Sequence, residues 1–268
     1  MENGLDTLEV SLKDALPKEE EVLVRKSSAK TWVIGDPHGG LRAIQQCFDR
    51  SGIDRERDHL ICIGDVADGW PDVAESLEEL LTVKHLSYVI GNHDVWLNNY
   101  LSGGHAPNIW TSQGGFASIE SYNNNTHLVK KHRDFYSKQP FYRVIDGNLY
   151  VHGGFYPLQS IEAQAGHDLM WDRDLWYRAS EISKMMNQAK MKRSIKYSMH
   201  QINNYKEIFI GHTTTSRITI DSPVNYLNIW NVDQGGGFEG RLTIMNVDTK
   251  DFFQSDLVKT LYPGVRGR

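Results

Sequence analysis

Five short apolar runs, spread over nearly the whole chain, each stop at a residue of the kind that binds metal ions. The first three, at 32–34, 61–63 and 87–90, are followed by Gly-Asp, Gly-Asp and Gly-Asn, and the last two, at 149–151 and 208–210, by His and Gly-His. Such a run is typical of a buried strand that delivers the next residue to a loop. One ending of this kind is usually only a turn, but five predict a shared site.

The expected sheet brings these endings together. Residues 41–51 carry apolar side chains at helical spacing between the first two runs, so this part of the chain indicates a βαβ unit and a largely parallel α/β sheet. In open α/β sheets the carboxyl ends of the strands meet at one edge, where ligands bind. The polar side chains expected at this edge are Asp36, His38, Asp65, Asn92, His152 and His212.

This set offers oxygen and imidazole ligands without a thiolate, which suits Mn, Fe or Zn. Two such ions that share a carboxylate are a common device for attacking phosphate esters, whose uncatalysed hydrolysis is among the slowest reactions known. Asp65 is the candidate for the centre of this chemistry. His93 directly follows Asn92, and an imidazole ordinarily titrates near neutral pH, so His93 is suited to protonating a leaving oxygen.

Each of these residues also has a simpler interpretation. His152 and His212 are compatible with core histidines at strand ends, and Asn92 with a turn residue. Asp68 is compatible with the N-cap of a helix that begins near Pro71. These interpretations explain the residues one at a time but not their order along the chain.

The composition sets wider limits. A chain of 268 residues with 40% hydrophobic content can bury a large core, and we expect one domain over residues 30–268 with an N-terminal extension, 1–29, of unassigned function. The net charge of −5 gives no strong nucleic-acid signal. Cys47 and Cys62 lack CxxC spacing and indicate buried thiols in a reducing compartment. No run is long enough to span a membrane, so we expect a soluble cytoplasmic protein. The oligomeric state is not indicated.

Further elements are expected along the chain. A helix is predicted at 72–81, an irregular excursion over the site at 96–125 with a helix near 115–122, and a hairpin at 141–151 that delivers His152. Residues 178–206 are basic and Met-rich. This composition favours an amphipathic helix whose methionines pack on the body of the protein. A lid that contacts substrate is the alternative. Residues 226–232 and 241–247 are predicted to form a closing antiparallel meander.

In this order the motifs resemble those of the calcineurin-like metallophosphoesterases, within them the bacterial and phage phosphoprotein phosphatases of the lambda phosphatase type. The match covers roughly residues 30–250. The matching motifs are Gly35 to Gly39 (GDxHG), Gly64 to Trp70 (GDxxDRG), Gly91 to Asp94 (GNHD), His152 to Gly154 (HGG) and Gly211 to Thr213 (GHT). Elements around Trp110, Trp171-Asp172-Arg173 and Asn231-Val232-Asp233 also resemble the bacterial branch.

The resemblance implies an α/β/β/α sandwich with a dinuclear metal site at the carboxyl ends of the strands. One ion would take Asp36, His38 and Asp65, and the other Asp65, Asn92, His152 and His212. It further implies a bridging water as nucleophile, His93 as general acid oriented by Asp68, and Arg173 with Asn92 on the substrate phosphate. Mn is the metal most expected, with Fe, Zn, Ni or Mg as alternatives. The expected location is the cytoplasm of a bacterial cell or of a phage-infected host.

One position departs from the family. Gly69 stands where the pattern has an arginine that clamps the phosphate, and Trp70 follows where it has glycine. Loss of a bidentate arginine weakens recognition of a doubly charged monoester. Three hypotheses follow: a basic residue between Lys184 and Lys196 replaces the clamp, the substrate is a diester or nucleotide whose base stacks on Trp70, or the enzyme is partly decayed.

The function implied by the resemblance is that of a phosphomonoesterase similar to a protein serine/threonine phosphatase, with a phosphorylated protein or peptide as substrate. A nucleotide phosphoesterase, similar to the diadenosine tetraphosphate hydrolases or to a cyclic phosphodiesterase, is the alternative within the same chemistry. A metal-binding module without turnover is the alternative from another class.

Overall fold

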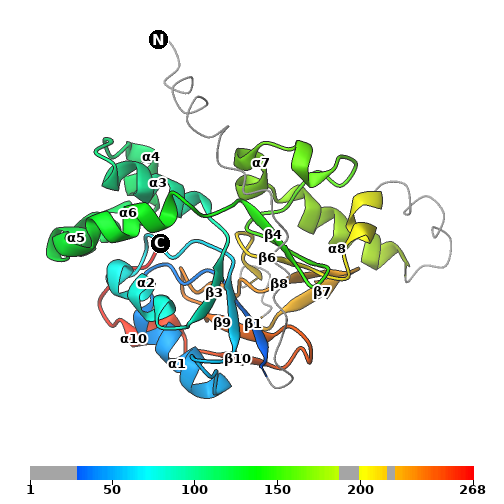
Figure 1. Cartoon of the computed structure of the whole chain (residues 1–268), viewed down its shortest axis with the longest axis horizontal. Coiled ribbons are helices and arrows are strands. Elements are labelled where there is room, and N and C mark those ends of the chain that lie inside the picture. Colours follow the sequence, from blue (N-terminus) through cyan, green and yellow to red (C-terminus); the bar gives the residue numbers. More distant parts are fainter. Residues whose placement is uncertain (1–28, 187–198, 216–220) are drawn as a thin grey trace, which may run out of the picture.

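Two five-stranded sheets lie face to face at the centre of the fold, with helices on their outer sides (Figure 1). The structure is a computed structural model that describes residues 29–186, 199–215 and 221–268. Nearly all of the expected extension 1–29 therefore lies outside the described residues, as does Met191, one of the methionines of the basic stretch 178–206. The arrangement confirms the predicted α/β/β/α sandwich.

The first sheet has the strand order β10-β9-β1-β2-β3. Strands β1 (Thr31–Ile34), β2 (His59–Cys62) and β3 (His85–Tyr88) are parallel, as the βαβ pattern predicted. Strands β9 (Thr243–Asn246) and β10 (Phe252–Gln254) extend the sheet in antiparallel fashion beyond β1.

The second sheet has the order β4-β5-β6-β8-β7. Strands β4 (Tyr142–Ile145) and β5 (Asn148–Val151) form the predicted hairpin, and β6 (Ile208–Ile210) and β8 (Ile229–Asn231) continue parallel to β5. Strand β7 (Val224–Tyr226) pairs antiparallel with β8.

Three apolar clusters separate the four layers, because successive side chains of a strand point to opposite faces. On β1, Trp32 and Ile34 join the cluster under the helices, whereas Val33 joins the cluster between the sheets. On the second sheet, Tyr150 and Phe209 point into the same central layer, and their rings stack with centroids 5.1 Å apart. The side chains next to them on the strands belong to the third cluster, beneath the helices of the second sheet.

Helices cover the outer face of each sheet (Figure 1). The first sheet is covered by α1 (Leu41–Ser51) and α2 (Val73–Leu81), both close to the predicted spans, and by α10 (Val258–Leu261). The second is covered by α7 (Gly166–Trp171) and α8 (Asp174–Met186). Short 3-10 helices occupy Thr126–Leu128, Ile161–Ala163 and His200–Asn204.

The segment predicted as an irregular excursion is largely helical, so that prediction was wrong except for its last helix. It contains α3 (Asn92–Leu101), α4 (Asn108–Trp110), a π-helical turn (Thr111–Gly115) and α5 (Phe116–Asn124), and α6 (Val129–Tyr136) follows.

Helix α3 shows why the helical pattern was hidden. It buries the polar side chains Asn92, His93 and Asp94 as well as the apolar Leu97 and Leu101. Polar residues at buried positions weaken the apolar periodicity by which a helix is recognised.

The predicted closing meander was also wrong. Strand β8 lies in the second sheet and β9 in the first, so the glycine-rich loop between them crosses from one sheet to the other. The start of the basic stretch is helical in α8, as expected, but Met185 is 43% exposed rather than packed on the body. Among the described residues, no helix is long and apolar enough to cross a membrane.

Candidate metal centre

Loops from both sheets converge on one buried cluster, in agreement with the pattern of strand endings. The loops after β1, β2 and β3 bring side chains from the first sheet, and those after β5 and β6 bring side chains from the second. All six expected ligands are at most 3% exposed: Asp36, His38, Asp65, Asn92, His152 and His212.

Asp65 lies at the centre of the cluster. Its Oδ2 is 3.2 Å from His152 Nε2 and 3.7 Å from His38 Nε2. Ligand atoms of Asp65, His152 and His212 all lie within 4.8 Å of one another, and so do those of Asp36, His38 and Asp65. Two groups of three potential ligands therefore share one carboxylate, which is the arrangement that two neighbouring cations require.

Backbone carbonyls fix the orientation of two imidazoles. His38 Nδ1 donates to Ala67 O and His152 Nδ1 donates to Ile63 O, both at 2.8 Å. Because a carbonyl only accepts, each ring carries a proton on Nδ1, and its Nε2 faces Asp65 in the cluster. Metal-binding histidines are commonly held in this way.

Unpartnered polar atoms indicate that the cluster suits cations. Among the described residues, Asp36 Oδ1 and both ring nitrogens of His212 are buried without a hydrogen-bond partner. Buried polar atoms without partners are costly and uncommon in native structures. A divalent cation would satisfy them, because it binds carboxylate oxygens and imidazole nitrogens together.

The ionisable side chains of the cluster have pKa values far from their usual ones. Burial, reinforced by Asp233, raises the pKa of Asp36 well above its usual value. Burial also raises that of Asp65, but the neighbouring histidines, His152 foremost, together outweigh burial and hold the pKa of Asp65 well below its usual range. Burial lowers the pKa of His152, and Asp65 overcomes this and raises it to about 9. A proton on His152 thus stabilises Asp65 in place of a cation.

The backbone of the cluster is held in an unusual conformation. Four non-glycine residues have positive φ angles: His38 at 45°, Asp65 at 51°, Asp68 at 71° and His212 at 59°. Each such residue costs about 1–3 kcal/mol and persists where surrounding contacts determine it, often at functional sites. The strained residues are therefore fixed by the rest of the fold.

Asp94 supplies much of that fixation, although the sequence reasoning gave it no role. Its carboxylate accepts the backbone N–H groups of Asp65, Val66 and Ala67 at 2.9–3.1 Å and the hydroxyl of Tyr88 at 2.8 Å. The loop that carries Asp65 is thus tied to the start of α3. Its place in the Gly91 to Asp94 motif was the only signal that pointed to it.

Two glycines are required by the carboxylates themselves. A Cβ atom at Gly211 would lie 2.1 Å from Asp36 Oδ1, and one at Gly91 would lie 2.1 Å from Asp65 Oδ1. These distances are well below van der Waals contact. The glycine in each motif allows the backbone of one strand end to approach the carboxylate of another.

His93 and Asp68 form a buried pair beside the cluster. His93 Nδ1 donates to Asp68 Oδ2 at 2.5 Å, and Asp68 also accepts from Trp110 Nε1 at 2.8 Å and Ser118 Oγ at 2.6 Å. Burial lowers the pKa of His93 to about 3 and raises that of Asp68. The N-cap interpretation of Asp68 was wrong, because α2 begins at Val73 and the Asp68 carboxylate is used by this network.

Arg173 follows α7 and lies next to His212. Its Nη1 donates to His212 O at 2.9 Å and to Thr213 Oγ1 at 3.3 Å. Trp171 packs edge-on against the His212 ring at 5.6 Å. The expected phosphate-binding arginine therefore lies at the edge of the cluster, on the side of the second sheet.

Sequence reasoning missed Arg268. Its Nη1 lies 3.3 Å from His38 Nε2, and its Nη2 donates to Gln113 Oε1 at 3.3 Å. Arg268 and Arg173 both lower the pKa of His212, after the larger effects of burial and His152. No motif surrounds Arg268, and 230 positions separate it from His38.

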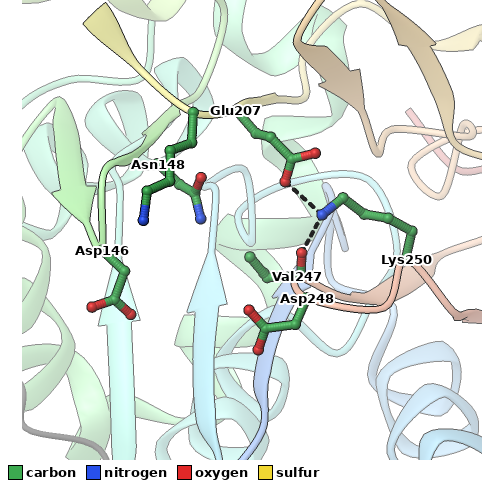
Figure 2. A pocket seen from close by; sticks show the side chains of 7 residues that line it. Asp146, Asn148, Glu207, Val247, Asp248 and Lys250 are labelled. Carbon is green, nitrogen blue, oxygen red and sulfur yellow. Dashed lines mark hydrogen bonds and ion pairs between the residues drawn. The ribbon is translucent and has the colours of Figure 1, made fainter.

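Two surface pockets lie outside this cluster. One is at the opposite ends of the strands, where Lys250 pairs with Glu207 across the opening (Figure 2). Its lining contains none of the expected ligands. The other is lined by Tyr156, His167 and Trp171, among others, and so adjoins the cluster through Trp171.

Comparisons with known proteins agree with this geometry. Residues 29–230 match the family described as calcineurin-like phosphoesterase. A serine/threonine-protein phosphatase 1 of Salmonella typhimurium is 23% identical over 239 residues, 85% of this chain and 98% of its own length. The symmetrical bis(5'-nucleosyl)-tetraphosphatase of Pseudomonas fluorescens is 35% identical over 68 residues. That match spans about a quarter of each protein, 25% of this chain and 24% of the relative.

Solved structures share the fold at low sequence identity. A putative diadenosine tetraphosphatase has a TM-score of 0.59 and 13% identity, with 86% of this chain and 95% of the other covered. A protein serine/threonine phosphatase from Saccharomyces cerevisiae has a TM-score of 0.56 and 15% identity, with 89% and 82% covered.

Proposed function

The chain belongs to the calcineurin-like phosphoesterase family, and from this premise we propose that it is a dinuclear metal-dependent phosphoesterase that prefers phosphate monoesters, as a protein serine/threonine phosphatase does. The observation that carries the proposal is the position of Asp65. Its Oδ2 lies within 3.7 Å of the Nε2 atoms of His38 and His152, which belong to two different groups of potential ligands.

The donor set divides between two ions. Asp36 and His38 would hold the first, Asn92, His152 and His212 the second, and Asp65 would bridge them. When bound, the ions would activate a water and neutralise the phosphoryl oxygens. Mn is the proposed metal, because a mixture of carboxylate, amide and imidazole ligands suits it, and Fe, Zn, Ni and Mg are the alternatives.

In this proposal His93 is the general acid that protonates the leaving group. Asp68 holds Nδ1, so Nε2 is the atom that exchanges a proton with the reacting oxygen. The negative charge of a bound phosphate ester raises the pKa of a neighbouring imidazole. His93 would therefore take up a proton at Nε2 when substrate binds and give it to the leaving oxygen. Arg173 and Asn92 would bind the phosphate.

Two observations support a monoester of a protein or peptide over a nucleotide. The phosphatase of Salmonella typhimurium matches 85% of this chain, whereas the bacterial tetraphosphatase matches 25%. The hypothesis that a base stacks on Trp70 was wrong, because that side chain is 1% exposed and already stacks on Tyr262. Tetraphosphates remain the second class of substrate to be tested.

A metal-binding module without turnover fits the site less well. Such a module has no use for the His93–Asp68 pair, which is buried and joined by a hydrogen bond of 2.5 Å next to the expected ligands.

The free, buried thiols of Cys47 and Cys62 support the proposed cytoplasmic setting in a bacterial or phage-infected cell. The proposed domain covers residues 30–268.

Hydrolysis of para-nitrophenyl phosphate, its bis-para-nitrophenyl diester and diadenosine tetraphosphate tests the proposal. The protein is stripped with a chelator and Mn is added back. We expect the monoester to be preferred, Asp65→Asn to abolish activity, and His93→Asn to lower kcat by about 10²- to 10⁴-fold. His132→Asn is the control, because His132 is buried away from the cluster with Tyr122 and Glu78. Preference for the diester or the tetraphosphate would overturn the assignment to monoesters.

A further inference from the structure

The last residues of the chain reach the candidate metal centre. Residues 262–268, here called the tail segment, follow α10 and end with Arg268 beside His38. The guanidinium lies between two elements, with Nη1 at His38 Nε2 and Nη2 at Gln113 Oε1. Its Cζ also lies 5.3 Å from the centre of the Phe238 ring. The side chain is therefore oriented from three sides.

The tail segment is anchored on Trp70. Tyr262 stacks on the Trp70 ring at 5.3 Å with an interplanar angle of 18°, and its hydroxyl donates to Asp72 Oδ2 at 2.7 Å. Gly267 passes so close to Trp70 that an added Cβ would lie 2.7 Å from the ring. The backbone N–H of Arg268 donates to Gly237 O at 2.8 Å. Trp70 is thus the surface that positions the tail segment.

Gly69 leaves the space that Arg268 uses. A Cβ at Gly69 would lie 3.6 Å from Arg268 Cβ and 3.1 Å from His38 Cβ. The side chain of Arg268 therefore starts next to the point where a side chain at position 69 would start. Positions 69 and 70 both depart from the family pattern. Gly69 makes room for Arg268, and Trp70 holds the segment that carries it.

The contact with His38 indicates that Arg268 is placed to bind an anion. A guanidinium only donates hydrogen bonds, and here it donates to the imidazole lone pair that the proposed function assigns to a metal ion. A cation on that lone pair would replace this bond and repel the guanidinium. An anion that contacts both the cations and the guanidinium removes the repulsion, and a phosphoryl group has oxygens for both.

Resting on the proposed function, we infer that Arg268 binds the phosphoryl oxygens of the substrate, together with Arg173, and supplies the phosphate clamp that position 69 lacks. Arg173 is tied to His212 O and Arg268 contacts His38, so the two arginines flank the cluster at ligands of different ions. Two guanidinium groups favour the dianion of a phosphate monoester over the single charge of a diester.

The earlier hypothesis of a basic residue from 184–196 is not needed, and residues 187–196 of that stretch lie outside the described residues.

Binding of inorganic phosphate to the Mn-loaded protein, measured by calorimetry, tests the inference without turnover. We expect Arg268→Ala to weaken phosphate binding by about tenfold to a hundredfold, since charge-assisted hydrogen bonds are lost, and Arg268→Lys to retain part of the affinity. Arg266→Ala is the matched control, because Arg266 is an exposed arginine of the same tail segment. Circular dichroism and the bound Mn content check that each variant keeps its fold and metals.

Three results separate the possibilities. Equal phosphate affinity in Arg268→Ala and the wild type would overturn the inference and leave the proposed function standing. Tighter binding in Arg268→Ala, with a lower KM for para-nitrophenyl phosphate, would overturn it in favour of a tail segment that blocks the site. Weaker binding in a protein that hydrolyses no ester would uphold the clamp while the proposed function fails.

Discussion

Asp68 illustrates how single residues prepare this site. Its carboxylate accepts from His93, Trp110 and Ser118, and the residue itself has a φ of 71°. Burial works against its charge, whereas the Ser118 and Trp110 donors favour it. The orientation of the His93 imidazole therefore depends on Trp110 and Ser118, to which the sequence assigned no role at the site.

Trp110→Phe tests this dependence. The substitution removes the indole N–H that contacts both oxygens of Asp68, and hydrogen bonds to charged groups are worth about 1.5–3 kcal/mol. We expect kcat for para-nitrophenyl phosphate to fall by about tenfold or more while Mn binding is retained.

The chain offers a matched control in Trp32→Phe. Trp32 Nε1 donates to Asp58 Oδ2 at 3.0 Å in a similarly buried setting, near the start of β1, whereas the cluster lies beyond the end of that strand. This variant is expected to lose comparable stability in urea unfolding without loss of kcat. A similar loss of kcat in both variants would show that the Trp110 bond acts only through stability.

At this scale the sequence predicted which side chains the fold brings together, but it did not predict the residues that support them. Asp36, Asp65 and His212 were predictable because each follows a strand and a glycine, and the ends of neighbouring strands must meet. Asp94 accepts backbone N–H groups of the loop that carries Asp65, and Arg268 contacts His38. Both contacts depend on the tertiary structure. No local pattern encodes such contacts.

Among the elements, the tail segment has the most direct link to function. Its position depends on the stacking of Tyr262 on Trp70 and on the hydroxyl bond to Asp72. If Arg268 clamps phosphate, any change that loosens the segment must weaken phosphate binding even though Arg268 is intact.

Tyr262→Ala is therefore expected to weaken phosphate binding of the Mn-loaded protein at least severalfold, with the Mn content unchanged. Phe253→Ala is the control, because Phe253 on β10 packs on the same apolar cluster against Trp32, away from the tail segment. Calorimetry with inorganic phosphate measures both. Unchanged affinity in Tyr262→Ala would mean that the anchor does not position Arg268.

The elements themselves were predictable where the pattern was simple. Helix α1 follows a clear helical pattern, β1 and β2 follow apolar runs, and β4 and β5 flank the predicted hairpin turn, and all lie close to their expected spans. Helix α3 was hidden because its first turn faces the site with polar side chains. The pairing of β9 with β1 joins segments more than 200 positions apart, and spacing alone does not determine which sheet a late strand joins.

For the molecule as a whole, the candidate metal centre joins the two sheets. Asp36, His38, Asp65 and Asn92 come from the ends of the first sheet, and His152 and His212 from the second. Two bound ions would therefore link both halves of the sandwich. Ligands that bind only the folded state stabilise it in proportion to the logarithm of their concentration above Kd, so the melting temperature should rise with Mn.

The number of metal ions per chain tests the central claim most directly. The protein is loaded with Mn, freed of excess metal and analysed by inductively coupled plasma mass spectrometry, with melting temperature measured alongside. We predict two Mn ions per chain for the wild type, and at most one for Asp65→Asn with little of the rise in melting temperature, because Asp65 belongs to both groups of ligands. A single ion in the wild type, or two ions retained by Asp65→Asn, would contradict a dinuclear centre bridged by Asp65.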